Sequence, residues 1–256
     1  MIKPILEGCK VLVCRPEPSA SALAHVLSSV GASVEKLPGI DIVPLALSGV
    51  EKDHILNLDQ FDHVIVISQH AAEIGISHID QYWPQFPSNQ KWHAIGRQTA
   101  RSLPDELPSL NTPSADLTSE ELLEDSDFSK LKNKKVLILK GRGGRSTLHD
   151  KLSRLGASVS LVELYERRVP SYSSAHLNSK LTDFDPDYFI ALSGETLTNL
   201  VAMFKQCEYD ASQKGFILSS NRVANIAIEH GFNLIYVPKN LMPIDIIQCI
   251  SKAQRK

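Results

Sequence analysis

Short apolar runs alternate along the chain with stretches whose apolar residues repeat at helical spacing. Residues 11–14 (Val-Leu-Val-Cys) are typical of a buried strand. Leu23 and Leu27 then share one helical face, and Gly31 stands where a helix C-terminal glycine is common. Strands alternating with helices predict a parallel sheet covered by helices on both faces. The predicted strands lie at 11–14, 34–37, 64–67, 93–95, 136–139, 159–164, 188–192, 216–218 and 234–237.

The chain also repeats itself. Residues 11–34 align without a gap on residues 136–159, with ten identities that include the Gly-Ala-Ser-Val ending of both segments. The same offset carries Ser68 onto Ser193, each just after an apolar run. This self-similarity predicts two copies of one α/β unit, and by itself it places their boundary near residue 130. Proline-containing stretches at 38–44 and 165–174 are predicted connectors.

Composition narrows the class of protein. The 256 residues suffice for one or two domains, and 43% hydrophobic with 22% charged residues is ordinary for a globular protein. The apolar runs are too short to cross a bilayer, and the start of the chain lacks the apolar stretch of a secretory signal. We therefore expect a cytoplasmic protein. The four cysteines form no CxxC and no zinc-ligand spacing, so we expect reduced thiols and no metal site.

Charge is uneven although the net charge is only −2. Residues 105–127 hold acids and no bases, whereas residues 132–145 hold bases and no acids. Two solvated faces would account for both runs. The alternative hypothesis is a local anion site around residues 140–145, where Lys140, Arg142 and Arg145 flank glycines.

Polar loops follow the predicted strands. In an open parallel sheet such loops meet at the carboxyl edge, where ligands bind, and each leads into a helix whose first N–H groups can bind an anion. Ordinary N-capping by Ser and Thr is the alternative for any single loop. Six loops on one edge favour a ligand with several negative groups. The loops are 15–16, 68–70, 96–99, 141–146, 193–196 and 219–222.

Known catalytic motifs are missing. The loop at 141–146 fits neither the Walker nor the GxGxxG pattern, and the chain has no GxSxG and no HExxH. Any reaction would then depend on holding a reactive substrate and placing a weak acid. Tyr165, at the end of a predicted strand, is the candidate, because a phenol can donate a hydrogen bond without being ionised. A structural tyrosine is the alternative.

These segments together resemble the uroporphyrinogen-III synthase family. The resemblance runs through residues 11–16, 61–71, 94–100, 136–145, 155–159, 165–167, 192–195 and 219–231. It implies an enzyme that closes the linear tetrapyrrole hydroxymethylbilane with loss of water and inversion of ring D, without a cofactor. It also implies two open parallel-sheet, flavodoxin-like α/β domains joined by two extended linker strands. The implied domains are 1–38 plus 173–256 and 49–164, with linkers 39–48 and 165–172.

The resemblance also implies site residues. Tyr165 would help the hydroxide leave ring A. The loops would bind the eight carboxylates of the substrate in a cleft between domains, which would move on their linkers. The implied substrate-binding residues are Arg15, Ser68, Gly96, Thr99, Lys140, Arg142, Gly143, Arg145, Ser193, Gly194 and Ser220.

The expected partners follow from the same reading. They are the small-molecule substrate and, transiently, the preceding pathway enzyme; we expect no nucleic acid and no membrane, and a monomer. The rival hypothesis is a non-catalytic, two-domain cytoplasmic protein that binds a small polyanionic or sugar-like ligand. Such a protein would share paired α/β domains but would not need Tyr165.

Overall fold

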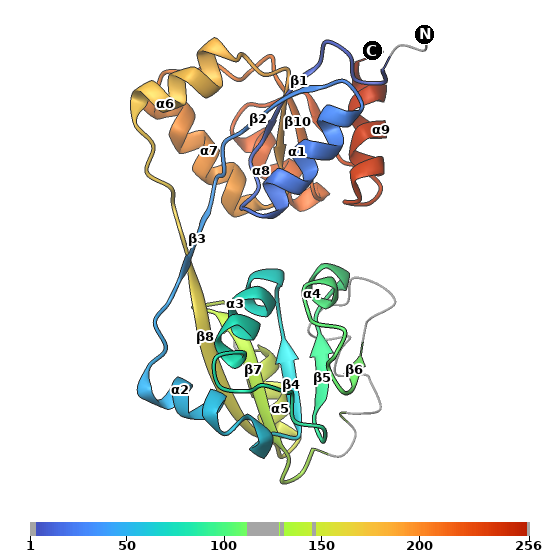
Figure 1. The fold of residues 1–256 in the computed structure, drawn as a ribbon. Coiled ribbons are helices and arrows are strands. Elements are labelled where there is room, and N and C mark those ends of the chain that lie inside the picture. Colours follow the sequence, from blue (N-terminus) through green and yellow to red (C-terminus); the bar gives the residue numbers. More distant parts are fainter. Residues whose placement is uncertain (1–3, 112–127, 129–130, 145–146, 255–256) are drawn as a thin grey trace. The chain divides into compact units, whose positions relative to one another are not determined.

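The computed structural model describes residues 4–111, 128, 131–144 and 147–254. Two compact units make up the chain (Figure 1). Unit 1 combines Met1–Asp41 with Arg168–Lys256, and unit 2 is Ile42–Arg167. The chain therefore leaves unit 1, builds the whole of unit 2 and returns.

Unit 1 is built on a five-stranded parallel sheet. Its spatial order is β11-β10-β9-β1-β2, and each neighbouring pair is parallel. This is the strand order of a flavodoxin-like sheet, which the family resemblance implies. The strands are β1 (Lys10–Val13), β2 (Ser33–Lys36), β9 (Tyr188–Ala191), β10 (Gly215–Leu218) and β11 (Ile235–Tyr236).

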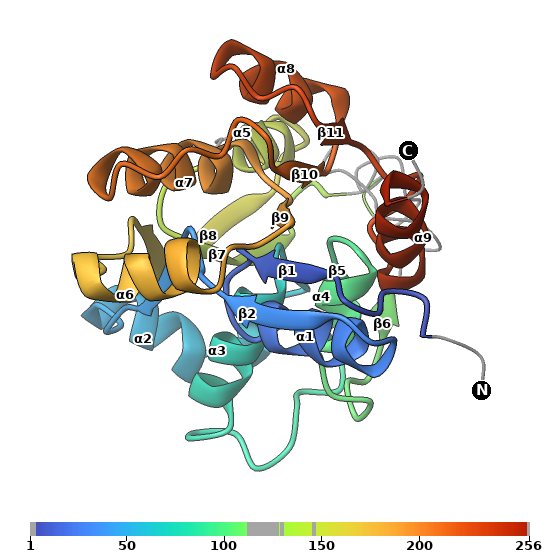
Figure 2. The same cartoon turned by 90° about the horizontal axis from the view of Figure 1, so that it is seen from above.

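Helices cover both faces of this sheet (Figure 2). Side chains alternate along β1, so Val11 and Val13 face α1 (Ser19–Ser29) and α9 (Pro243–Ala253). Leu12 faces the opposite core, which takes side chains from α6 (Ser174–Asn178), α7 (Gly194–Gln206) and α8 (Asn221–Glu229). A π-helical turn, Ser179–Asp183, follows α6. Burial on both faces explains why the central strands β1, β9 and β10 are nearly continuous apolar runs.

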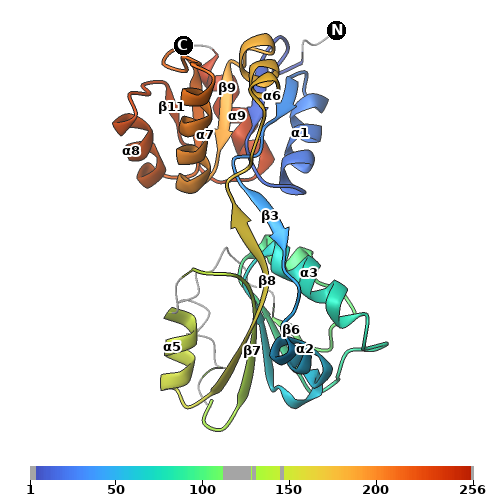
Figure 3. The same ribbon diagram turned by 90° about the vertical axis from the view of Figure 1, so that its left-hand side faces the viewer.

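Unit 2 has a six-stranded sheet in the order β3-β8-β7-β4-β5-β6. The pairs from β8 to β6 are parallel, and the arrow of β3 points against that of β8 (Figure 3). The strands are β3 (Asp41–Pro44), β4 (His63–Val66), β5 (Lys91–Ala94), β6 (Leu110–Asn111), β7 (Lys135–Gly141) and β8 (Ser158–Arg168).

The helices of unit 2 also lie on two faces. One core contains residues of α2 (Gly49–Leu56), α3 (Gln69–Ile79) and α4 (Arg97–Arg101), with the 3-10 turn Leu58–Gln60. The other core contains residues of α5 (Thr147–Arg154). The prediction of α/β architecture is confirmed in both units.

The repeat explains why the two sheets match. The aligned segments 11–34 and 136–159 pair β1-α1-β2 with β7-α5-β8, and the Ser68–Ser193 match pairs β4-α3 with β9-α7. When each strand is replaced by its counterpart, the order β2-β1-β9-β10-β11 of unit 1 becomes the order β8-β7-β4-β5-β6 of unit 2, to which β3 is added. A boundary near residue 130 is wrong, because the strands on either side of that residue pair in one sheet.

Both predicted connectors contain strand. Residues 41–44 form β3, and β8 continues past Tyr165 to Arg168. The Leu45 N–H donates to the Leu164 carbonyl at 2.9 Å, so backbone pairing holds the two segments extended. The chain changes unit at 41/42 and 167/168, within the segments 39–48 and 165–172. The finer domain limits stay a prediction.

We predict that Phe216→Ala strongly destabilises unit 1. Phe216 is fully buried and stacks on Phe232 with a centroid distance of 4.3 Å. Truncating such a ring costs roughly 3–5 kcal/mol of unfolding free energy. Urea unfolding measures the loss. Ile244→Ala is the control, because Ile244 is 57% exposed and its truncation should cost under about 0.5 kcal/mol.

Candidate active site

The polar loops divide equally between the two sheets. Loops 15–16, 193–196 and 219–222 follow β1, β9 and β10 in unit 1, and loops 68–70, 96–99 and 141–146 follow β4, β5 and β7 in unit 2. The interpretation that all six lie on one edge is therefore wrong. Each copy of the repeat contributes strands to both sheets, so three loops fall on the carboxyl edge of each.

The strand order singles out one position on each edge. In unit 2 the chain runs outward through β4, β5 and β6, then returns to add β7 and β8 on the other side of β4. The loops after β4 and β7 therefore diverge, and such a switch point is where open α/β sheets bind ligands. Ser68 and Gly141 flank it in unit 2. By the same logic Arg15 and Ser193 flank the switch point between β1 and β9.

Tyr165 lies at the switch point of unit 2. Its Oη is 2.9 Å from the Oγ of Ser68, which follows β4. The ring rests on the backbone of Gly141, where a Cβ would be 2.6 Å from Tyr165 Cζ and 3.0 Å from Oη. The His70 ring also packs near it, with centroids 5.6 Å apart. With 8% of its surface exposed, Tyr165 is a well-packed side chain.

An irregularity in the β7–β8 pairing brings Tyr165 to this place. Lys140 pairs with Glu163, but the next residue, Gly141, pairs with Tyr165, so β8 carries one extra residue. A bulge of this kind re-aims a side chain. The Arg142 N–H donates to the Tyr165 carbonyl at 2.6 Å, so the backbone pairing of the two segments continues beyond the bulge.

Two of the predicted loop serines are helix caps. Ser68 Oγ accepts from the Ala71 N–H at 3.1 Å, and Ser193 Oγ accepts from the Thr196 N–H at 3.1 Å. The capping alternative therefore holds for both, and it does not exclude a further role. Ser220 occupies the same place before α8, without a side-chain cap bond in the part of the chain described.

Thr99 is an enclosed residue of α4. Its side chain is buried, at 3% exposure of the residue, and its hydroxyl donates to the Ile95 carbonyl at 2.7 Å. The hydroxyl thus bonds to the backbone just before α4, and the substrate-binding role implied for Thr99 stays a prediction. Gly96 caps the same helix with φ of 84°, a conformation that favours glycine.

Two acidic side chains of β8 lie beside the bases Lys140 and Arg142, which the sequence pattern did not reveal. Arg142 Nε lies 3.4 Å from Glu163, and its Nη1 lies 3.3 Å from Glu166. Lys140 Nζ is 3.8 Å from the other oxygen of Glu163. Both bases therefore already have acidic partners, and the predicted anion site around residues 140–145 stays a prediction. In a regular strand Glu163 and Glu166 would point to opposite faces of the sheet. The bulge in β8 lets both side chains reach Arg142.

The remaining predicted residues lie as follows. Gly143 has φ of 75° and open space around its Cα, whereas Arg145 lies outside the described residues, as does most of the acidic segment 105–127. Burial lowers the pKa of Arg15. A Cβ on Gly194 would be 3.0 Å from the Ile226 side chain, so the start of α7 packs tightly on α8.

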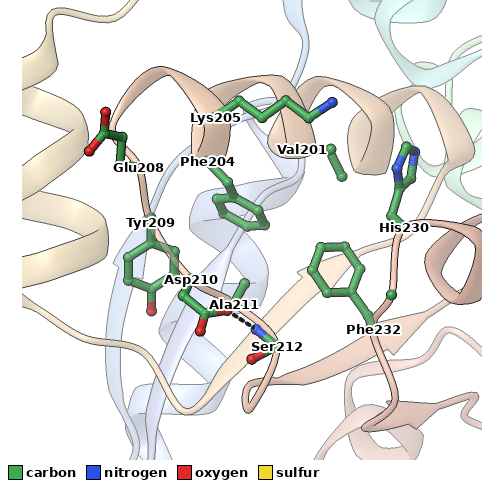
Figure 4. A pocket seen from close by; sticks show the side chains of 11 residues that line it. Val201, Phe204, Lys205, Glu208, Tyr209, Asp210, Ala211, Ser212, His230 and Phe232 are labelled. Atoms are coloured by element: carbon green, nitrogen blue, oxygen red, sulfur yellow. Dashed lines mark hydrogen bonds between the residues drawn. The ribbon is translucent and has the colours of Figure 1, made fainter.

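A pocket in unit 1 lies away from the polar loops of the same unit. Its volume is about 260 Å³, and its lining includes Phe204, Tyr209 and Phe232 with Lys205 and His230 at the rim (Figure 4). Residues 209–212 precede β10 and residues 230–232 precede β11, so the pocket is at the amino ends of the strands. Among the residues that the structure describes, no predicted site residue lines it.

Two features are absent from the described residues. No group of three or more His, Cys, Asp or Glu residues lies close enough together to hold a metal ion. No helix in the same part of the chain combines the length and hydropathy needed for a membrane span.

Fold and site define a class: a protein of two flavodoxin-like α/β units with polar loops at the carboxyl edges of both sheets and a phenol at one switch point. Residues 21–248 match the sequence profile of the family described as uroporphyrinogen-III synthase HemD. The chain belongs to the uroporphyrinogen-III synthase family, an enzyme family of porphyrin biosynthesis.

Individual relatives agree. The uroporphyrinogen-III synthase of Salmonella typhimurium is 29% identical over 90% of this chain and 95% of its own length, and that of Escherichia coli is also 29% identical, with the same coverage. Among solved structures, the Helicobacter pylori synthetase matches with TM-score 0.61 at 16% identity, covering 96% of this chain and 99% of that one. A mutant Thermus thermophilus synthase matches with TM-score 0.59 at 13% identity, covering 97% and 99%. These likenesses show the fold, and the rival binding-protein hypothesis finds no support among them.

We predict that Gly141→Ala displaces Tyr165. The added methyl group would fall within 3.0 Å of the phenol ring, so the ring must leave its place beside Ser68. Overpacking of this kind costs roughly 1–3 kcal/mol, which urea unfolding would show. A crystal structure of the variant should show Tyr165 Oη beyond hydrogen-bond distance of Ser68. Gly49→Ala is the control, since nothing lies within 4 Å of its Cβ position.

Proposed function

We propose that this chain is a uroporphyrinogen-III synthase acting as a hydro-lyase: it closes hydroxymethylbilane to uroporphyrinogen III with loss of water and inversion of ring D. The family match over residues 21–248 supports the reaction. The observation that links this reaction to particular atoms is the placement of the Tyr165 phenol, which Ser68 and Gly141 contact at the switch point of unit 2.

In the proposed reaction the C–O bond of the hydroxymethyl group on ring A breaks, and its electron pair goes to the oxygen. Tyr165 donates a hydrogen bond to this oxygen, which leaves as water once protonated. The remaining azafulvene carbon is attacked by the substituted carbon of ring D, forming a spirocycle. The bond from that ring D carbon to its former bridge then breaks, and the bridge rejoins at the free position. The proton released there balances the proton taken by the leaving hydroxide.

Control of this reaction is mainly a matter of positioning, because hydroxymethylbilane also cyclises unaided to the unrearranged isomer. The substrate carries eight carboxylates, and the starts of α3 and α7 present backbone N–H groups and the positive end of the helix dipole. At Lys140 and Arg142, a substrate carboxylate would replace Glu163 or Glu166 as partner of the base. Anchoring many carboxylates leaves few conformations, so one closure is favoured.

The setting belongs to the same proposal. We place the enzyme in the cytoplasm as a monomer that needs no cofactor, binds neither nucleic acid nor membrane, and transiently meets the preceding enzyme. Cys9, Cys14, Cys207 and Cys249 form no disulfide with one another, as in a reducing compartment.

The product isomer tests the reaction. Purified protein supplied with freshly made hydroxymethylbilane should give uroporphyrinogen III, identified chromatographically after oxidation to the porphyrin. A reaction without protein gives the background of the unrearranged isomer. If the protein leaves that background unchanged, the proposed function is wrong.

Tyr165→Phe tests the phenol. The variant keeps the ring that packs on Gly141 but loses the hydroxyl, so its fold should survive while turnover falls by about 10²-fold, the scale of one acid group. Circular dichroism checks the fold, and the rate of uroporphyrinogen III formation measures the effect. Wild-type turnover would remove Tyr165 from the mechanism.

A further inference from the structure

The hydroxyl of Ser68 serves two neighbours at once. Its oxygen accepts the Ala71 N–H at 3.1 Å and thereby caps α3. The same oxygen lies 2.9 Å from Tyr165 Oη. A serine hydroxyl has one proton and two lone pairs, so this geometry permits two arrangements of the protons.

The two arrangements have opposite consequences for catalysis. If Tyr165 donates to Ser68, the phenol proton is held within the protein and is not offered to a leaving group. If Ser68 donates to Tyr165, the phenol oxygen already accepts a bond and its own proton points elsewhere. Only the second arrangement leaves Tyr165 as a donor.

The surroundings of Ser68 favour the second arrangement. An N-cap oxygen turns its lone pairs toward the first N–H groups of the helix, so its proton points away from α3. Tyr165 Oη lies 2.9 Å from this oxygen and can accept that proton. Gly141 holds the ring at contact distance, which limits the positions that Oη can reach.

We propose, on the basis of the function proposed above, that Ser68 is a positioning residue whose hydroxyl donates to Tyr165 and so leaves the phenol proton free for the departing hydroxide. Ser68 acts through Tyr165 and does not itself bind a substrate carboxylate. This differs from the substrate-binding role that the family resemblance implies for Ser68.

Three variants test whether Ser68 donates or accepts the hydrogen bond with Tyr165. Ser68→Asp still caps α3, because a carboxylate accepts N–H bonds at a helix start, but it only accepts and therefore draws the phenol proton to itself. Its kcat should fall by about 10²-fold, as in Tyr165→Phe. Ser68→Gly lacks the hydroxyl yet suits an N-cap, and its kcat should fall by roughly tenfold. Ser68→Thr keeps a hydroxyl of the same kind and should stay within about threefold of wild type. KM should change little in all three variants.

Ser173 provides a matched control for capping. It caps α6 by accepting the His176 N–H at 3.2 Å, and it belongs to unit 1, whereas Ser68 and Tyr165 belong to unit 2. Ser173→Asp and Ser173→Gly should leave kcat and KM unchanged. A loss of kcat in these variants equal to that in the Ser68 variants would attribute both to helix capping and overturn the proposal.

A double-mutant cycle with Tyr165→Phe gives the decisive readout. If Ser68 acts through the phenol, Ser68→Gly should cost no further kcat once the phenol hydroxyl is gone. A raised KM, or a loss that persists in the Tyr165→Phe background, would show a direct substrate contact and overturn the proposal. So would wild-type kcat in Ser68→Asp.

Failure of the broader function would look different. It would appear in the wild-type protein, as absence of uroporphyrinogen III. Failure of the positioning role requires an active wild type and an impaired Tyr165→Phe variant. The same assay therefore separates the two outcomes.

Discussion

The close contact between the Tyr165 ring and the backbone of Gly141 is the constraint on which the site depends. A side chain on residue 141 would occupy the space of the ring, so the phenol reaches Ser68 only because this position is glycine. The bulge between Lys140 and Gly141 supplies the other half of the constraint, because it sets Tyr165 opposite Gly141 in the ladder. Local backbone geometry thus places a weak acid at the switch point of unit 2.

The internal repeat and the crossing of the chain are two aspects of one architecture. Unit 1 takes β1 and β2 from the start of the chain and β9 to β11 from its end, while unit 2 uses the continuous middle. Each sheet nevertheless has the same spatial order, with its switch point beside the strand that precedes Ser68 or Ser193. The arrangement gives each unit three polar loops on its carboxyl edge, which suits a substrate with anionic groups along its length.

Charge at the site is balanced by the protein itself. Glu163 and Glu166 accompany Lys140 and Arg142, so these bases do not form a bare cationic patch. Partly exposed ion pairs of this kind contribute little net stability, and exchanging one carboxylate for another is therefore inexpensive. This balance suits a protein that must release a polyacid after turning it over.

Sequence alone determined most of the local elements, because apolar runs and helical spacing predict the central strands of both sheets and the helices that follow them, although not β3 or β6. It also singled out Tyr165 and the loop that begins at Gly141, since glycine clusters and strand ends are visible in one dimension. The internal repeat taken alone misplaced the boundary between the units, and the sequence could not show the pairing of Arg142 with Glu163 and Glu166 or the enclosure of Thr99. Strand order, register and a one-residue bulge decide these features, and they arise from contacts between residues far apart in the chain.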